Sequence, residues 1–420
     1  MLRDLVPRLK EAAAARRQRL SETLRERASE TPRERAAETP RNRVPETPRD
    51  RAVDALRALA IVGVVLGHWL VTAPVADSGV LRVTSPLKYM PQLAPVSWLF
   101  QTMAVFFFVG GRVAAGSRGR ARDRGVGHGR WAAARMARLF RPVVPVLGVW
   151  SAAAVAMLAW GADPGTVYAL VKLVWSPMWF LLVFAALTAA TPLAVRLHPV
   201  WPFAAVAVAD LVRFGLSGPS WIGWVNVGTG WLVPYCLGAL WARGRLDGRV
   251  TGWALLLGGA AATAGLVLWA GYPASMVGVP GAPVSNQSPP TLAAVAFGLA
   301  QCGAALVLSG PLRRVLRRPA AWALVAAANL CAMTIFLWHQ TAMIAVTAAA
   351  LRLAGGALPG LHTVPGDPGW VAARLAWLPA FVAALAVCVA AFRRHETRRP
   401  AGGGKPLRGP RRERHAGGSA

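Results

Sequence analysis

Long apolar stretches alternate with short polar segments from residue 53 to residue 392. A helix needs about 20 apolar residues to cross the hydrocarbon core of a bilayer. Ten stretches have about this length: 54–74, 93–115, 143–162, 174–195, 199–216, 221–242, 251–272, 291–310, 321–351 and 370–392. The pattern therefore predicts an all-α integral membrane protein, a bundle of about ten transmembrane helices embedded in the lipid bilayer.

Basic residues are divided unevenly between the segments that connect these spans. One alternating set of connections, which includes both ends of the chain, carries most of the arginines. The other set carries far fewer, namely Arg82, Lys88, Lys172 and Arg352, and Arg213 and Arg374 lie inside spans near that side. Cytoplasmic loops of membrane proteins carry the excess of Lys and Arg. We therefore expect both termini on the cytoplasmic side of a bacterial plasma membrane.

Two polar segments flank the apolar region. Residues 1–52 are rich in Arg and Glu and contain an octad repeat, SETLRERA, SETPRERA, AETPRNRV and PETPRDRA, whereas residues 394–420 are basic and rich in Gly. Both segments hold too few apolar residues to form a core, and proline interrupts a helix in three octads. We expect a disordered cytoplasmic arm, a membrane domain over 53–393 and a disordered tail.

The net charge of +29 does not by itself indicate a nucleic-acid partner, because the basic groups lie between apolar spans. Only 15% of the residues are charged and 55% are hydrophobic, as in a membrane protein. The four cysteines are scattered through apolar spans, which is typical of small core residues and not of a disulfide or metal site: Cys236, Cys302, Cys331 and Cys388.

The first span, VDALRALAIVGVVLGHWLVT, contains Arg57 and His68. Ionisable groups in hydrocarbon are costly and mark function or a buried pairing. Eleven helical residues bring the two side chains onto one face, about 16 Å apart along the axis. Two interpretations stay open. Either Arg57 pairs with Asp54 and His68 packs against its neighbours, or both residues belong to a functional site.

A second histidine, His339, lies in the ninth span within MTIFLWHQT. Imidazole accepts a proton near neutral pH, which the activation of a hydroxyl nucleophile requires. We expect His68 and His339 to face one cavity. A zinc site needs more ligands than two histidines, and the nearest candidate, Cys331, lies about 80° around the helix from His339, so we expect no metal.

The connection before the third span carries Arg135, Arg138 and Arg141 at intervals of three residues. If this segment is helical, the three side chains form a basic stripe at the mouth of that span. The stripe is either ordinary cytoplasmic charge or a clamp for phosphate groups, which arginine forks fit well.

Other polar residues inside the spans have weaker implications. Asp210 and Arg213 are three positions apart in the fifth span, and we expect a structural ion pair. Asn226, Thr229 and Gln301 either line a cavity or form bonds between helices.

Five segments resemble, in chain order, the motifs of the membrane-bound acyltransferase family 3. The family's opening signature, an Arg and a His with ten residues between them, is similar to DALRALAIVGVVLGH. Four further segments resemble its FF-x-x-S-G, basic, W-F-L and Y-L-x-H motifs: FFFVGG (106–111), RMARLFRP (135–142), MWFLLVF (178–184) and TIFLWHQ (334–340). The likeness covers residues 50–395, about the whole apolar region. Gly110 stands where the family has Ser, and Phe336 where it has Tyr.

The resemblance implies an enzyme that transfers an acyl group, commonly acetyl from cytoplasmic acetyl-coenzyme A, to hydroxyls of cell-envelope carbohydrates, lipids or secreted small molecules. It implies that Arg57 and His68 are the essential pair. It further nominates Arg135, Arg138 and, less directly, Arg141 near the phosphates of the acyl-coenzyme A donor.

We therefore expect an O-acyltransferase in which His68 is a general base or carries the acyl group, and His339 is a second acid–base or orienting group. The alternative is a membrane transporter or exporter without acyl chemistry. In that protein Arg57, His68, Asp210 and Arg213 would form a proton or anion path. The sequence does not select the acceptor or the oligomeric state.

Overall fold

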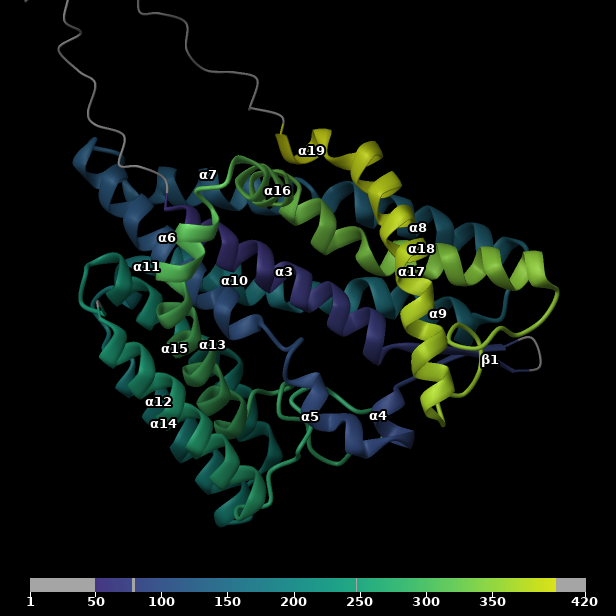
Figure 1. The fold of residues 1–420 in the computed structure, drawn as a ribbon, viewed down its shortest axis with the longest axis horizontal. Coiled ribbons are helices and arrows are strands. Elements are labelled where there is room, and N and C mark those ends of the chain that lie inside the picture. The colour runs from purple at the N-terminus through teal and green to yellow at the C-terminus, as the bar shows by residue number, and fades with distance from the viewer. Residues whose placement is uncertain (1–49, 78–79, 247, 398–420) are drawn as a thin grey trace, which may run out of the picture. The chain divides into compact units, whose positions relative to one another are not determined.

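The computed structural model describes residues 50–77, 80–246 and 248–397, so nearly all of the predicted arm and tail lies outside the described residues. Helices dominate this part of the chain (Figure 1). The helices of four or more residues are α3 (Arg51–Val71), α4 (Pro86–Tyr89), α5 (Ala94–Ser97), α6 (Met103–Asp123), α7 (His128–Phe140), α8 (Val143–Ala159), α9 (Pro164–Trp175), α10 (Trp179–Ala189), α11 (Thr191–Ala194), α12 (Val200–Asp210), η3 (Leu211–Gly215), η4 (Ser220–Trp224), α13 (Val225–Ala242), α14 (Arg249–Leu268), α15 (Leu292–Val315), α16 (Pro319–Leu330), α17 (Ala332–Ala354), α18 (Pro368–Phe392) and α19 (Arg394–Thr397).

Within the described residues, seven segments are long and apolar enough to cross a membrane: α3, α7 with α8, α9 with α10, α14, α15, α17 and α18. They correspond to seven of the ten predicted spans, and the protein is a multi-pass membrane protein. The remaining three ranges contain α6, α12 with η3, and α13. α6 is apolar only in its first half and α12 has 11 residues, so the count of ten stays a prediction.

Two features differ from an all-helical chain of simple spans. A short antiparallel hairpin of β1 (Ala73–Asp77) and β2 (Val80–Thr84) follows α3, with Ala73 paired to Thr84. The predicted ninth span, 321–351, is divided at Cys331 into α16 and α17. No Pro or Gly marks this break in the sequence, which is why the range was expected to be one long helix.

α3 lies at the centre of the packing. It contacts α6, α15, α16 and α17, and Figure 1 shows it in purple between these helices. Ile61, Val65 and Trp69 belong to the larger hydrophobic cluster, whereas Val53 and Leu56 belong to a second one. Burial along most of α3 holds the helix in place, whereas Leu59 and Val62 are exposed.

Glycines allow α6 and α13 to pack closely. A Cβ at Gly111 would overlap the backbone of Tyr235, and one at Gly238 would overlap the carbonyl of Phe108. The segment FFFVGG therefore ends where α6 and α13 approach closely. A Cβ at Gly110 would meet the Phe184 ring, so this ring takes the space that a serine side chain would need.

Candidate functional site

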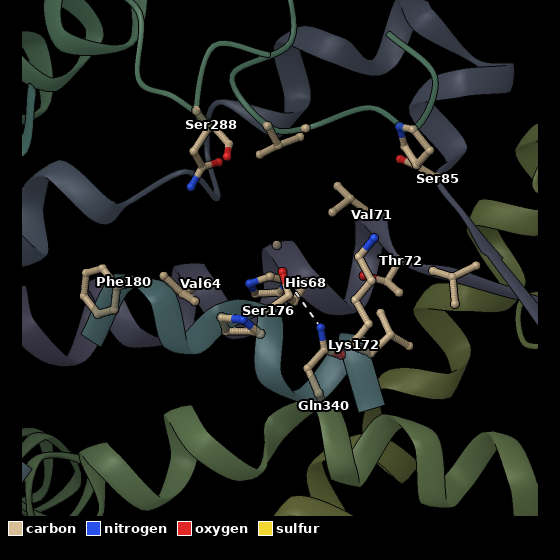
Figure 2. Close-up of a pocket in the computed structure, with 18 of the residues that line it drawn as sticks. Val64, His68, Val71, Thr72, Ser85, Lys172, Ser176, Phe180, Ser288 and Gln340 are labelled. Carbon is tan, nitrogen blue, oxygen red and sulfur yellow. Dashed lines mark hydrogen bonds between the residues drawn. The ribbon is translucent and has the colours of Figure 1, made fainter. Parts of the chain in front are cut away.

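A pocket of about 590 Å³ lies at the C-terminal end of α3, and we call it the His68 pocket. Its walls come from α3, β2, α9, α10, α17 and the loop before α15. Figure 2 shows ten of the lining residues by name: Val64, His68, Val71, Thr72, Ser85, Lys172, Ser176, Phe180, Ser288 and Gln340. Hydroxyl and amide groups are frequent in this lining. Among the described residues that line the pocket, Lys172 is the one with a charged side chain.

His68 is half-buried and lines the pocket. Its Nδ1 lies 3.3 Å from the side-chain Nε2 of Gln340, the contact drawn as a dashed line in Figure 2. The amide nitrogen and oxygen of a glutamine exchange places by a half-turn, so Gln340 is able to donate to Nδ1 or to accept from it. The contact is thus compatible with a proton on either ring nitrogen of His68.

His339 lies directly beside His68, with the two ring centroids 5.0 Å apart. The expectation from the sequence was that both histidines face one cavity. His339 is buried and does not line the pocket, however, and its Nδ1 donates to the Phe336 carbonyl at 2.5 Å. Because a carbonyl only accepts, this bond places the proton of a neutral His339 on Nδ1. His339 thus supports His68 from behind, without facing the cavity.

The backbone that carries His68 is fixed by two long-range contacts. The indole Nε1 of Trp69 donates to the His339 carbonyl at 2.9 Å, which joins α3 to α17. Arg374 of α18 is fully buried and donates to the carbonyls of Trp69 at 2.7 Å, Thr72 at 2.6 Å and Gly360 at 2.9 Å. The end of α3 is therefore held in one position relative to α17 and α18.

Arg57 lies at the opposite end of α3. Its Nε donates to Asn329 Oδ1 of α16 at 2.5 Å, and Asn329 Nδ2 donates to the Asp54 carbonyl at 2.8 Å. α3 is one uninterrupted helix, so Arg57 and His68 are separated by about 16 Å along its axis. Arg57 does not line the His68 pocket.

The arginines of α7 are near Arg57. Arg135 and Arg138 lie on α7, and Arg141 directly follows it, as the spacing predicted. The cationic side chains whose charge acts on Arg135 are Arg138, Arg120 and Arg57. We call Arg57, Arg120, Arg135 and Arg138 the Arg57 cluster. The structure thus brings the predicted basic stripe and the predicted Arg57 together, at a distance from His68.

A second pocket, of about 460 Å³, lies between α6, α11 and the end of α13, and we call it the arginine pocket. None of the arginines nominated from the sequence lines it. Its residues are Ala115, Gly116, Arg118, Gly119, Arg122, Pro192, Val195, Arg196, Ala242 and Arg243.

Glu396 of α19 caps the beginning of α17. Its carboxylate accepts from the backbone N–H groups of Met333 at 3.2 Å and Thr334 at 3.1 Å, and from the Thr334 hydroxyl at 2.8 Å. Burial raises the pKa of the Glu396 carboxyl, against the opposing effect of these bonds and of the Arg57 charge. The predicted tail therefore begins with an ordered turn that lies near Arg57.

Asp210 is buried and joins several segments. It accepts from Asn226 Nδ2 at 2.9 Å, the Tyr272 hydroxyl at 3.0 Å and the Leu292 N–H at 2.7 Å. No ion pair links it to Arg213 in the part of the chain that the structure describes. The expected Asp210–Arg213 pair is thus wrong, because hydrogen-bond donors from α13, the loop at Tyr272 and α15 take its place. Gln301 similarly donates to the Gln101 carbonyl, which is a bond between segments.

Metal ligands do not gather anywhere in the described residues: no three His, Cys, Asp or Glu side chains form a group able to hold an ion. The four cysteines are free thiols.

Comparison with known proteins identifies the family. The sequence profile of the acyltransferase domain of acyltransferase family 3 matches residues 50–393. No curated protein and no solved structure gives a significant match. The matched range covers every helix from α3 to α18, including the His68 pocket and the Arg57 cluster. This chain belongs to acyltransferase family 3, and it is a membrane acyltransferase.

Proposed function

We propose that this protein is an O-acyltransferase that moves an acyl group, in the first instance acetyl, from acyl-coenzyme A to a hydroxyl of a carbohydrate, a lipid or a secreted small molecule. The arrangement along α3 carries the proposal: Arg57 lies in a basic cluster at one end, and His68 faces a polar pocket at the other. An acyl-coenzyme A joins phosphates to a distant thioester. It therefore needs an anion-binding region and an acid–base group at separate points.

The proposal includes ten membrane-spanning segments with both termini in the bacterial cytoplasm. In this topology α6, α12 with η3, and α13 complete the seven apolar segments. The Arg57 cluster adjoins the arginine-rich connections, which the positive-inside rule assigns to the cytoplasm, where acyl-coenzyme A is made. The His68 pocket then opens toward the outside, where an envelope or secreted acceptor arrives.

The proposed chemistry is a direct transfer assisted by His68. The imidazole Nε2 removes the proton from the acceptor hydroxyl while the hydroxyl oxygen attacks the thioester carbonyl. The C–S bond then breaks, and the protonated imidazole returns the proton to the thiolate of coenzyme A. This role requires the proton of neutral His68 on Nδ1, which the Gln340 amide oxygen accepts when that amide is turned toward the ring. A positioned base of this kind contributes about 10²- to 10⁴-fold in rate.

The transporter alternative has less support. Its path was expected to use Asp210 and Arg213 with Arg57 and His68. Asp210 already accepts three hydrogen bonds, and neither Asp210 nor Arg213 lines the His68 pocket. These two residues fit a structural junction better than a conduction path.

The test uses the full chain in membrane vesicles that are open to both sides. Vesicles receive acetyl-coenzyme A labelled in the acetyl group and an extract of envelope polysaccharide, lipid and culture medium. Coenzyme A release is measured together with the label recovered in each fraction. The variants are His68→Ala and, as a matched control, His198→Ala, since His198 is exposed and lines neither pocket.

We expect coenzyme A release and labelling of one acceptor fraction with the wild type and the control, and loss of both with His68→Ala. Undiminished transfer by His68→Ala would refute the proposed base. Proton-coupled solute flux without coenzyme A release would favour the transporter instead.

A further inference from the structure

The arginine pocket gathers charge from three separate elements. Arg118 and Arg122 come from α6, Arg196 follows α11, and Arg243 directly follows α13. The lining contains four arginines and no carboxylate. Arg122 is paired with its neighbour Asp123 at 3.7 Å, but both side chains are largely exposed, so this contact is weak. Arg118 also donates to the Val126 carbonyl at 3.3 Å. Four arginines around one pocket without a carboxylate in its lining favour an anionic ligand with several oxygens.

Small residues form the floor between these arginines. A Cβ at Gly119 would meet no atom within 4 Å, and one at Gly116 would meet only the end of the Arg120 side chain. Pro192, Val195 and Ala242 add apolar surface. The pocket is therefore open at its base and combines apolar walls with a cationic rim. This combination fits a flat aromatic base that carries phosphate groups better than a bare inorganic anion.

The arginine pocket adjoins the Arg57 cluster. On α6, Arg118 and Arg122 are four residues apart and share a face, and the guanidinium of Arg120 lies over Gly116 of the pocket while its charge acts on Arg135. The two basic regions thus adjoin at Arg120. Tyr235 also lies beside the pocket, since its hydroxyl is 2.8 Å from that of Thr191, next to Pro192.

We infer that the arginine pocket binds the 3′-phosphoadenosine end of the acyl-coenzyme A donor. The inference rests on the proposed use of acyl-coenzyme A. In this arrangement the nucleotide lies in the arginine pocket, the diphosphate passes the Arg57 cluster, and the pantetheine arm runs toward His68. Gly116 in the arginine pocket and Met103 in the His68 pocket are separated by thirteen residues of α6, roughly 20 Å, a distance that suits an extended arm.

The test compares two donors, acetyl-coenzyme A and acetyl-3′-dephospho-coenzyme A, with the purified full chain in lipid nanodiscs. The double variant Arg196→Gln/Arg243→Gln removes two arginines of the pocket. The matched control is Arg245→Gln/Arg249→Gln, two exposed arginines of the same connection that do not line the pocket. Turnover gives kcat and KM for each donor. Thermal protection by adenosine 3′,5′-bisphosphate measures binding independently of turnover.

We expect the wild type and the control to prefer the 3′-phosphorylated donor by about tenfold or more, as charge-assisted bonds to a phosphate allow. The pocket variant should lose this preference through a higher KM, with kcat unchanged, and should lose protection by the bisphosphate. An unchanged preference in the pocket variant overturns the inference. So does a variant that instead loses co-purifying anionic phospholipid, because the pocket would then hold a lipid headgroup.

Failure of the proposed function has a different signature. If no coenzyme A is released by any form of the protein, the proposed transfer is wrong. Selective protection by the bisphosphate would still establish the nucleotide site, and absence of protection in the wild type would overturn it.

Discussion

The two ends of α3 place their ionisable residues in opposite settings. At one end Arg57 belongs to a group of like charges, the Arg57 cluster, and donates to Asn329. At the other end His68 contacts two uncharged groups, Gln340 and His339, in a pocket that also holds Lys172. A concentration of positive charge attracts phosphates from a distance, whereas a histidine in a polar pocket suits proton transfer. Under the proposed function, one end of α3 therefore binds the donor and the other end carries the reacting group.

The sharpest test of this contrast compares His68→Ala with Arg57→Ala. We expect His68→Ala to lower kcat by about 10²- to 10⁴-fold, because the base is lost. Arg57→Ala should chiefly raise the KM for acyl-coenzyme A, because a cation near the donor phosphates is lost. Steady-state kinetics in nanodiscs measures both. The contrast fails if Arg57→Ala keeps full activity while His68→Ala abolishes it, or if both variants change only kcat.

Arg374→Met tests whether the His68 end depends on a rigid support. The substitution leaves the carbonyls of Trp69, Thr72 and Gly360 without their guanidinium donors, which we expect to cost about 3 kcal/mol or more. The thermal midpoint of the detergent-solubilised protein should fall. Arg352→Met, which alters an exposed arginine, serves as the control and should leave that midpoint unchanged. Equal midpoints for the two variants would contradict a structural role for Arg374.

Gln340→Leu tests the orientation of the imidazole. Loss of the amide removes the partner of His68 Nδ1, and we expect kcat to fall about tenfold while the donor KM stays constant. Gln340→Glu retains an oxygen acceptor and should keep more activity than Gln340→Leu. A purely structural role predicts parallel losses of stability and activity, so the thermal midpoint is measured alongside. Full activity in Gln340→Leu would exclude the positioning role.

Substitution of Glu396, near the Arg57 end of α3, should have the smallest effect on stability. Glu396→Ala removes the cap of α17 and should cost about 1 kcal/mol, whereas Glu396→Gln keeps an acceptor and should cost less. Burial raises the pKa of Glu396 above its ordinary 4.5, so the folded protein binds this proton more tightly than the unfolded chain. The contribution of Glu396 is therefore largest below pH 4.5 and declines as pH rises through the raised pKa.

Thermal midpoints measured across this pH range, for the wild type and Glu396→Gln, check the sign. The stability of the wild type relative to the glutamine variant should decline with rising pH. If the relative stability of the wild type instead rises with pH, the hydrogen bonds and the Arg57 charge outweigh burial in setting the pKa of Glu396.

Local patterns predicted much of the fold. Apolar length alone located seven segments that the structure confirms as long apolar helices, and helical periodicity placed Arg57 and His68 on one face. The neighbours of His68 were harder to predict from the sequence. His339 was found because a second buried histidine is rare, but its position behind His68 depends on the packing of α17 against α3.

Long-range contacts account for what was missed. Arg374 donates to the Trp69 carbonyl, 305 positions earlier in the chain. From the sequence it was counted only among the basic residues near the less basic side of the membrane. Gln340 directly follows His339, yet its contact with His68 depends on the register between α17 and α3. The arginine pocket combines residues of three elements, so their spacing along the chain carries no signal. Arg374 lies inside an apolar span, and that position was the sequence signal that could have indicated a buried structural role.

The bond from Trp69 to the His339 carbonyl lies behind the His68 pocket, because neither residue lines it. It joins α3 to α17, the two helices that carry His68 and Gln340 on one wall of the pocket. The facing wall is different in kind, since Pro280, Ser285 and Gln287 belong to the loop before α15. Under the proposed function, we therefore expect exchange of that loop to change the choice of acceptor while the contact between His68 and Gln340 is kept.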